Sequence, residues 1–208
     1  MNIILNNITK KYGHNEILKN FNLSINRNSS LAILGDSGKG KSTLLNIIAL
    51  FEDIDDGEII IDGLNVTDKE FNKMLYWRYK LGYLFQNYAL VDNLSVEKNL
   101  QIAIKYLDKS KKDKQILIEE ALGKVGLLDK YRKQVYTLSG GEQQRLAFAR
   151  LMIKPCDIVL ADEPTGALDL QNRNYIIELL KKIQEKNTLI IVTHDKEVAK
   201  ICNNIIEI

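Results

Sequence analysis

A glycine-rich stretch in the first quarter of the chain leaves few choices for the fold. Residues 35–42 are Gly-Asp-Ser-Gly-Lys-Gly-Lys-Ser, and they join the apolar run Leu31–Leu34 to the segment Ser42–Leu50, which is apolar at helical spacing. Glycines let the backbone turn tightly so that successive N–H groups point at one anion. The N-terminus of the following helix attracts phosphate through its dipole. A buried strand, such a loop and a helix in this order predict an α/β core that binds a phosphorylated ligand.

The polar side chains of this loop suit a nucleoside triphosphate. Lys41 would place a positive charge at the β- and γ-phosphates, and the Ser42 hydroxyl would ligate Mg²⁺. Lys39 and Asp36 occupy variable positions of the pattern, and we expect their side chains to be solvated. The candidate nucleotide contacts in this stretch are Gly35, Ser37, Gly38, Gly40, Lys41, Ser42 and Thr43.

The composition favours one domain and argues against several classes of function. The chain has 208 residues, with 29 Lys and Arg against 27 Asp and Glu, and the net charge of +2 argues against a nucleic-acid partner. No apolar run reaches about 18 residues and no basic, apolar leader is evident, so we expect neither a membrane-spanning helix nor a secretion signal. The two cysteines, Cys156 and Cys202, adjoin apolar runs and are expected to be buried free thiols.

The apolar pattern predicts an antiparallel section at the N-terminus. Residues alternate between apolar and polar over Ile3–Ile8 and Ile17–Ile25, which predicts two strands joined by a turn near Tyr12–Asn15. Glu58–Asp62 predicts a further strand between two turns.

The middle of the chain differs from both ends. Residues 87–150 hold no convincing buried strand, and Lys105–Lys114 and Gln115–Val125 are expected to be helical. The lysine-rich run within them, residues 109–114, is expected to be a solvated connection rather than a binding patch. We therefore expect one domain, with residues 1–86 and 151–208 forming the core and its β subdomain and residues 87–150 an inserted α-helical subdomain.

After residue 155 strands and helices alternate again. Ile158–Ala161 and Thr188–Thr193 predict buried strands on either side of a helix over Asn172–Lys186, followed by a helix and a last strand near Ile205. Alternation at this spacing is typical of a parallel sheet with crossover helices.

Two carboxylates follow the buried run that starts at Ile158. Open α/β sheets bind ligands at the carboxyl ends of their strands. We therefore expect Asp162 to hold Mg²⁺, directly or through water, and Glu163 to polarise the attacking water as a general base.

A second anion-binding helix start lies in the middle of the chain. Residues 138–145 are Leu-Ser-Gly-Gly-Glu-Gln-Gln-Arg, and they lead into an apolar-periodic helix over Leu146–Met152. One nucleotide does not need two such sites in one protomer, but the second site makes sense if it caps the nucleotide of another subunit. In this string the sequence resembles the ATP-binding cassette (ABC) family over essentially its whole length. The resemblance implies a P-loop NTPase (RecA-like) core, ATP and Mg²⁺ as cofactors, and nucleotide contacts from Ser139, Gly140 and Gly141.

The resemblance assigns roles to further positions. Tyr12 matches the aromatic residue that stacks on adenine, and Gln86 matches the glutamine that contacts Mg²⁺ and water and relays to a membrane partner. Asp169 ends the string Gly-Ala-Leu-Asp, which matches the loop that crosses the dimer interface. His194 matches the histidine that contacts the γ-phosphate, and with Glu163 and Gln86 it completes the expected catalytic set.

The resemblance is narrower at residues 161–169 and 83–92. The first string is similar to lipoprotein-release and macrolide-export ATPases, although that group usually has Asn where Ala167 stands; the second is similar to compact ATPases of bacteriocin-export systems of the lactococcin-972 type. The resemblance implies a head-to-tail dimer of two copies around two ATP molecules, and a separate membrane permease docked near Gln86–Leu100. The implied location is the cytoplasmic face of the membrane, and the implied function is export of a peptide, bacteriocin, lipoprotein or drug.

Three other classes of function fit the motifs less well. A non-transport relative that acts on DNA or ribosomes would carry a long coiled coil or two cassettes, which are absent here. A nucleotide-binding regulator would not need both Glu163 and His194. A P-loop kinase would have no use for residues 138–145.

Overall fold

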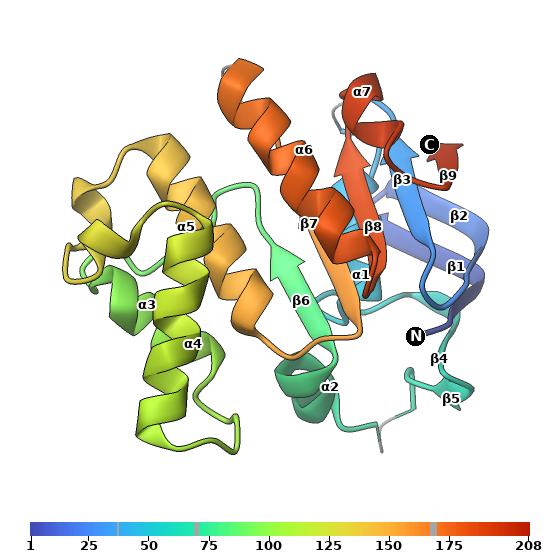
Figure 1. Cartoon of the computed structure of the whole chain (residues 1–208). Helices are drawn as coiled ribbons and strands as arrows, with labels where there is room; N and C mark the ends of the chain where they lie inside the picture. Colours follow the sequence, from blue (N-terminus) through green and yellow to red (C-terminus); the bar gives the residue numbers. More distant parts are fainter. Residues whose placement is uncertain (37, 69–70, 167–169) are drawn as a thin grey trace.

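The chain folds into two sheets and a group of helices (Figure 1). The structure, a computed structural model, describes residues 1–36, 38–68, 71–166 and 170–208, without the side chains of residues 170 and 171. None of the helices in those residues has the length and apolar content that a membrane crossing requires.

The first sheet is antiparallel, with strand order β2-β1-β4-β5. Its strands are β1 (Ile3–Tyr12), β2 (Asn15–Ile25), β4 (Asp56–Ile61) and β5 (Leu64–Asn65). In β1, Ile3, Leu5 and Ile8 are fully buried while Ile4 is exposed, so the sheet has one face in the core and one in solvent. The predicted N-terminal strands are therefore present, and β1 continues four residues beyond Ile8 to the turn.

The second sheet is parallel throughout, with strand order β6-β7-β8-β3-β9. Its strands are β3 (Ser30–Leu34), β6 (Leu81–Leu84), β7 (Ile158–Asp162), β8 (Thr188–Thr193) and β9 (Asn204–Glu207). Helices cover it on both sides, and α1 (Lys41–Ile48), α5 (Gly140–Ile153), α6 (Leu170–Gln184) and α7 (Lys196–Ala199) all pack near it. This is the expected parallel sheet with crossover helices.

Side chains of the parallel strands alternate between two separate apolar clusters. In β3, Leu31 and Ile33 belong to a first cluster shared with the antiparallel sheet and α1, whereas Ala32 and Leu34 belong to a second shared with α5, α6 and α7. Successive side chains of a strand point to opposite faces, so a strand covered on both sides must be apolar throughout. This explains why the central strands are continuous apolar runs.

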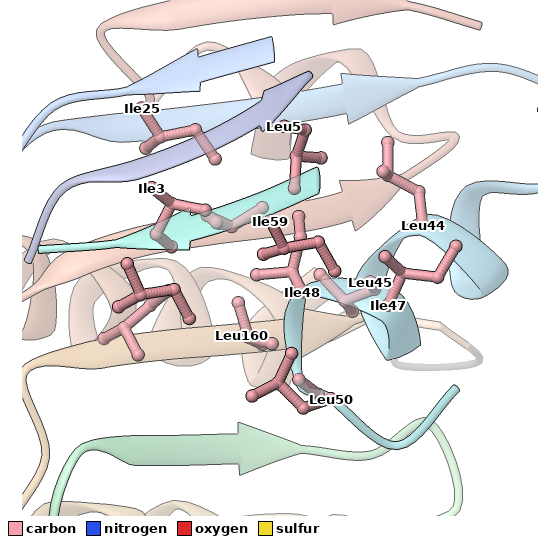
Figure 2. Packing of buried hydrophobic residues seen from close by; sticks show 14 of the residues in the cluster. Ile3, Leu5, Ile25, Leu44, Leu45, Ile47, Ile48, Leu50, Ile59 and Leu160 are labelled. Carbon is pink, nitrogen blue, oxygen red and sulfur yellow. The ribbon is translucent and has the colours of Figure 1, made fainter. Parts of the chain in front are cut away.

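Helix α1 fills the space between the two sheets. Figure 2 shows its side chains Leu44, Leu45, Ile47 and Ile48 between the antiparallel strands and Leu160 of β7. All four are fully buried, so the helix that follows the glycine-rich loop is fixed in place from two sides.

A third apolar cluster holds the helical part together. It joins α3 (Val96–Ala103), α4 (Lys111–Lys124) and one face of α5, with short 3₁₀ turns η1 (Leu128–Lys130) and η2 (Val135–Thr137) between the last two. Helix α5 contributes to both the second and the third clusters, because Phe148 packs toward the parallel sheet and Leu146 toward α3 and α4.

The sequence-based assignment was wrong for part of this region. The helix expected over Lys105–Lys114 does not form over that range, because Ser110 accepts a hydrogen bond from the Asp113 N–H and starts α4 at Lys111. Of the lysines expected in a solvated connection, Lys109, Lys111 and Lys112 are exposed, whereas Lys114 is half-buried and donates to the Lys105 carbonyl. Helices α2 (Lys73–Tyr79) and α3, and the edge strand β6, were not predicted.

Candidate nucleotide-binding site

Loops after β3, β6, β7 and β8 meet at the carboxyl end of the parallel sheet. They border a cavity of about 380 Å³. Of the residues predicted from the sequence, the cavity is lined by Gly38, Gly40, Lys41, Ser42, Thr43, Gln86, Glu163 and His194. The fold thus brings together residues that lie up to 156 positions apart in the chain.

The ammonium group of Lys41 lies at the glycine-rich loop. Its side chain is 6% exposed, and Nζ donates to the carbonyls of Gly35 and Asp36 at 2.7 and 2.8 Å. As the first residue of α1, it places an ammonium group at the helix N-terminus, where the backbone N–H groups also point. The two features together make this end of α1 attractive to an anion.

Ser42 and Asp162 meet across the base of the site. Ser42 Oγ donates to Asp162 Oδ1 at 3.2 Å, although the two residues are 120 positions apart. Burial raises the pKa of the Asp162 carboxyl above its ordinary value; the Ser42 hydrogen bond lowers the pKa, and the nearby Glu163 charge raises it. A hydroxyl and a carboxylate are hard oxygen donors of the kind that Mg²⁺ prefers.

Glu163 lies at a sharp turn directly after β7. Its φ of 46° is in the left-handed region that non-glycine residues seldom adopt. The turn is held by hydrogen bonds from Glu163 N to Val192 O and from Gly166 N to Glu163 O. It directs the carboxylate to His194, whose Nδ1 is 2.9 Å from Glu163 Oε2, while Thr193 Oγ1 donates to the same oxygen at 3.3 Å.

Two glycines of the loop have backbone positions that a side chain would obstruct. Gly40, at φ +88°, would place a Cβ 2.4 Å from Ile17 Cγ2, and Gly35 would place one 2.3 Å from the Ile208 carbonyl oxygen. The loop is therefore enclosed by β2 on one side and by the residue after β9 on the other. A backbone this close to its neighbours requires glycine.

The segment Ser139–Gly141 begins α5 with a capping box. The Ser139 hydroxyl accepts from Glu142 N, and the Glu142 carboxylate accepts from Ser139 N. Lys130 Nζ lies 2.6 Å from the same carboxylate. Ser139, Gly140 and Gly141 are not among the residues that line the cavity.

The remaining predicted residues lie at the edge of the cavity, away from it, or outside the described residues. Gln86 is exposed at the edge of the cavity, directly after β6 and Phe85. Tyr12, at the end of β1, is 47% exposed and does not line the cavity; Lys10 Nζ lies 5.2 Å from its ring centroid. The predictions for Ser37 and Asp169 concern residues outside the described part of the chain.

Sequence reasoning did not select Ile17, Gly166 and Thr193 as site residues. Ile17 and Gly166 line the cavity, and Thr193 binds the Glu163 carboxylate. Gly166 follows the acidic pair by three residues and Thr193 precedes the histidine, so proximity to a motif could have indicated both. Ile17 carried no such signal, because it is one of several apolar residues in β2.

The fold and the phosphate-type loop at the end of β3 define a P-loop NTPase. The chain belongs to the ABC transporter family, whose sequence profile matches residues 18–166. This match confirms the predicted family, the predicted fold class and the prediction of an ATPase.

Two relatives illustrate the range of the family. The macrolide export ATP-binding/permease protein MacB of Campylobacter jejuni is 38% identical over 208 residues, which cover 99% of this chain and 32% of the relative. The spermidine/putrescine import ATP-binding protein PotA of Clostridioides difficile is 41% identical over 201 residues, covering 95% of this chain and 56% of the relative. The chain thus spans about a third of the length of MacB and somewhat more than half of PotA.

Solved structures agree with the fold over nearly the whole chain. A dimeric structure of the ATP-binding cassette MJ0796, in a post-hydrolysis state bound to ADP and Pi, is 35% identical with a TM-score of 0.90. It covers 99% of this chain and 94% of that one. A second dimeric structure of MJ0796, a bacterial ABC transporter cassette, is 36% identical with the same TM-score.

Proposed function

We propose that this chain binds and hydrolyses MgATP and powers export of a peptide, bacteriocin, lipoprotein or drug through a membrane permease. The observation that carries the catalytic part is the 2.9 Å contact between Glu163 and His194 beside the cavity that Lys41 and Ser42 line. A carboxylate and an imidazole so placed can share the work of activating water and holding the γ-phosphate.

The roles follow from the chemistry of each side chain. Lys41 and the N–H groups at the start of α1 would bind the β- and γ-phosphates, and Tyr12 would stack on adenine. Ser42, Asp162 and Gln86 supply oxygen donors that would hold Mg²⁺, which neutralises phosphate charge when bound. Glu163 would accept the proton of the attacking water, with His194 keeping the carboxylate oriented and contacting the γ-phosphate.

A second copy would complete each site. Ser139, Gly140 and Gly141 begin a helix away from their own cavity, so in a head-to-tail dimer they would bind the nucleotide held by the other copy. The dimeric MJ0796 structures support two copies. Asp169 would lie at the interface of that dimer.

The permease would dock in a groove of about 420 Å³ between the parallel-sheet core and α3. Five large apolar side chains that line it are exposed, namely Phe51, Met74, Tyr79, Ile102 and Tyr106. The charged residues that line it are Arg78, Arg150 and Lys154, and none of its described lining residues is acidic. Contiguous exposed apolar surface marks interaction sites, and this groove fits a short permease helix with apolar anchors and carboxylates at its ends.

The domain arrangement suits that assignment. We take residues 1–86 and 151–208 as the nucleotide-binding core with its β subdomain and residues 87–150 as the helical subdomain. The groove lies where the two parts meet, next to Phe85 and Ala89. Docking there would place the chain on the cytoplasmic face of the membrane and next to Gln86, which lines the nucleotide cavity.

Import is a second candidate for the direction of transport. The 41% identity to the polyamine import protein PotA favours it, whereas the similarity to the macrolide exporter MacB, which covers 99% of this chain, favours export. Co-purification with a permease encoded beside this gene, and ATPase activity with and without it, would decide between them. An export-type permease with a large extracytoplasmic domain is the expected result, and a permease with a substrate-binding partner would support import.

Glu163→Gln tests the catalytic assignment. The amide keeps the shape of the carboxylate but cannot accept the proton of water, so we expect ATP binding to persist while turnover falls by about 100-fold or more. The variant should also accumulate as an ATP-dependent dimer in size-exclusion chromatography. Glu185→Gln, at an exposed position directly after α6, is the control and should retain turnover. Wild-type turnover in Glu163→Gln would contradict the assignment of the base.

A further inference from the structure

Gln144 connects the start of α5 to the turn that carries Glu163. It lies one turn into α5, and its side chain is 2% exposed. Its Nε2 donates a buried hydrogen bond to the carbonyl oxygen of Pro164, the residue directly after Glu163. The bond thus joins α5 to the loop after β7 across 20 positions of sequence.

The next residue of α5 makes a matching contact. Arg145 Nη1 donates to Asn172 Oδ1 at 3.2 Å, and the Gly141 backbone approaches the same asparagine. Gln144 and Arg145 therefore hold the polypeptide at Pro164 and at Asn172. The first two turns of α5 are attached to both ends of the segment that leads from Glu163 into α6.

This attachment matters because the Glu163 turn is strained. A non-glycine residue seldom adopts the left-handed region and persists there only where its surroundings hold it. The hydrogen bonds from Glu163 N to Val192 O and from Gly166 N to Glu163 O hold the turn from the β7 and β8 side. Gln144 adds a bond from α5 at the adjacent peptide.

We propose that Gln144 is a positioning residue, which keeps the Glu163 turn in its left-handed conformation and makes it move together with the start of α5. A link between the two ATP sites of a dimer would follow, and this link rests on the proposed function. Ser139, Gly140 and Gly141 begin the same helix, so a nucleotide bound there by the second copy would be linked through Gln144 to the base of this copy's own site.

The energetics separate this role from simple stabilisation. Gln144 Oε1 is buried and accepts no hydrogen bond from any residue that the structure describes. This oxygen therefore adds nothing to stability, but the Nε2 bond does, because without it the buried Pro164 carbonyl loses its donor. A role confined to folding therefore predicts that Gln144→Met lowers stability and leaves kcat unchanged.

Gln144→Met tests the proposal. The side chain keeps its length and loses the donor, so we expect kcat for ATP to fall about tenfold while KM and nucleotide affinity change less than about twofold. The thermal midpoint should fall somewhat, because the Pro164 carbonyl loses its donor, so kcat is measured well below the melting transition. Gln144→Asn, whose amide is too short to reach Pro164, should shift kcat in the same direction.

A second measurement does not depend on turnover. We expect the Gly166 amide, which donates to Glu163 O, to exchange its hydrogen about tenfold faster in Gln144→Met than in the wild type. Gln184→Met, at a half-buried helical position whose amide donates to Asn203 at 3.4 Å, should change neither kcat nor Gly166 exchange.

The outcomes distinguish the two proposals. Wild-type kcat and unchanged Gly166 exchange in Gln144→Met would overturn the positioning role. A fall in kcat matched by an equal fall in nucleotide affinity would also overturn it. An inactive wild type would contradict the proposed function, while faster Gly166 exchange in Gln144→Met would still support the link to the turn.

Discussion

Asp162 and Glu163 are neighbours in sequence but have different surroundings. Asp162 ends β7, accepts a hydrogen bond from Ser42 and is partly buried. Glu163 is turned away by its left-handed φ and meets His194. Two adjacent carboxylates thus have different partners, and under the proposed function Asp162 would hold Mg²⁺ while Glu163 would activate water.

The raised pKa of Asp162 gives a prediction about stability. A carboxyl whose pKa is higher in the folded than in the unfolded state destabilises the fold once it ionises. The cost is absent below the unfolded value of 3.8, grows as pH rises through the folded pKa, and is complete above it. We therefore expect Asp162→Asn to melt at a higher temperature than the wild type at pH 7.5.

The pH dependence supplies the control for that prediction. The difference in melting temperature between Asp162→Asn and the wild type should shrink as the pH is lowered toward 4. The Asp162 carboxyl then takes up a proton and becomes neutral, as the asparagine amide is at every pH. Asp129→Asn, at an exposed position in η1, should show no such gain. A lower melting temperature for Asp162→Asn at pH 7.5 would show that the Ser42 hydrogen bond outweighs the cost of burial.

Two helices connect the parts of the fold. Helix α1 packs between the two sheets, and α5 packs against the parallel sheet on one face and α3 and α4 on the other. Each begins with a motif of the proposed ATP site, the glycine-rich loop before α1 and Ser139–Gly141 at α5. Burial along the helix therefore fixes the position of the anion-binding end.

The contact between Gly40 and Ile17 shows how tightly α1 is placed. A Cβ at Gly40 would overlap Ile17 Cγ2 in addition to the strain of its positive φ. We expect Gly40→Ala to lower the free energy of unfolding by more than Gly63→Ala, whose φ is +81° but whose Cβ would meet nothing within 4 Å. Strain alone accounts for about 1 kcal/mol at either position.

Denaturant unfolding of four variants tests this interpretation. In the double variant Ile17→Ala with Gly40→Ala, the overlap is gone, so the cost of the glycine substitution should fall to that seen for Gly63→Ala. An equal cost for Gly40→Ala in both backgrounds would contradict the role of Ile17.

For the whole molecule, the groove and the segment Ser139–Gly141 lie at different places on the surface. The groove lies between α2, β6 and α3, while Ser139–Gly141 lie at the opposite end of α5 from Lys154. Under the proposed function, one chain would therefore contact a permease and a second copy at the same time.

The groove assignment is tested by reversing a charge. Arg78 lines the groove and lies 3.9 Å from the ring centroid of Tyr106. We expect Arg78→Glu to abolish co-purification with the permease through like-charge repulsion while ATP affinity stays unchanged. Arg27→Glu, exposed after β2 and outside the groove, should co-purify normally; equal recovery of both variants would contradict docking here.

The head-to-tail arrangement is tested by mixing two inactive variants. Lys41→Ala damages the phosphate loop, and Gly141→Asp damages the segment proposed to act on the other copy. In a mixed dimer one site has both intact parts, so an equal mixture should recover about a quarter of the wild-type rate. No recovery from properly folded variants would contradict completion of the site by a second copy.

Local motifs were predictable because they encode the backbone within a few residues. The loop at 35–42, the strand that ends at Asp162 and the capped start of α5 each form where the sequence indicated. Alternation of apolar residues also identified the central strands. The helices α2 and α3 and the strand β6 are short, so their patterns were too brief to stand out, and β6 relies on β7 for its backbone hydrogen bonds.

The amino-acid sequence thus set the chemistry of the site and its order along the chain, because phosphate loops, strand ends and helix caps depend on neighbouring residues. Folding set the contacts between distant segments: Ser42 with Asp162, Glu163 with His194, Ile17 against Gly40, and Gln144 with Pro164. Their distances depend on how α1 and α5 pack against the sheets. Side-chain volume and sheet register govern that packing, and neither is a property of one local segment.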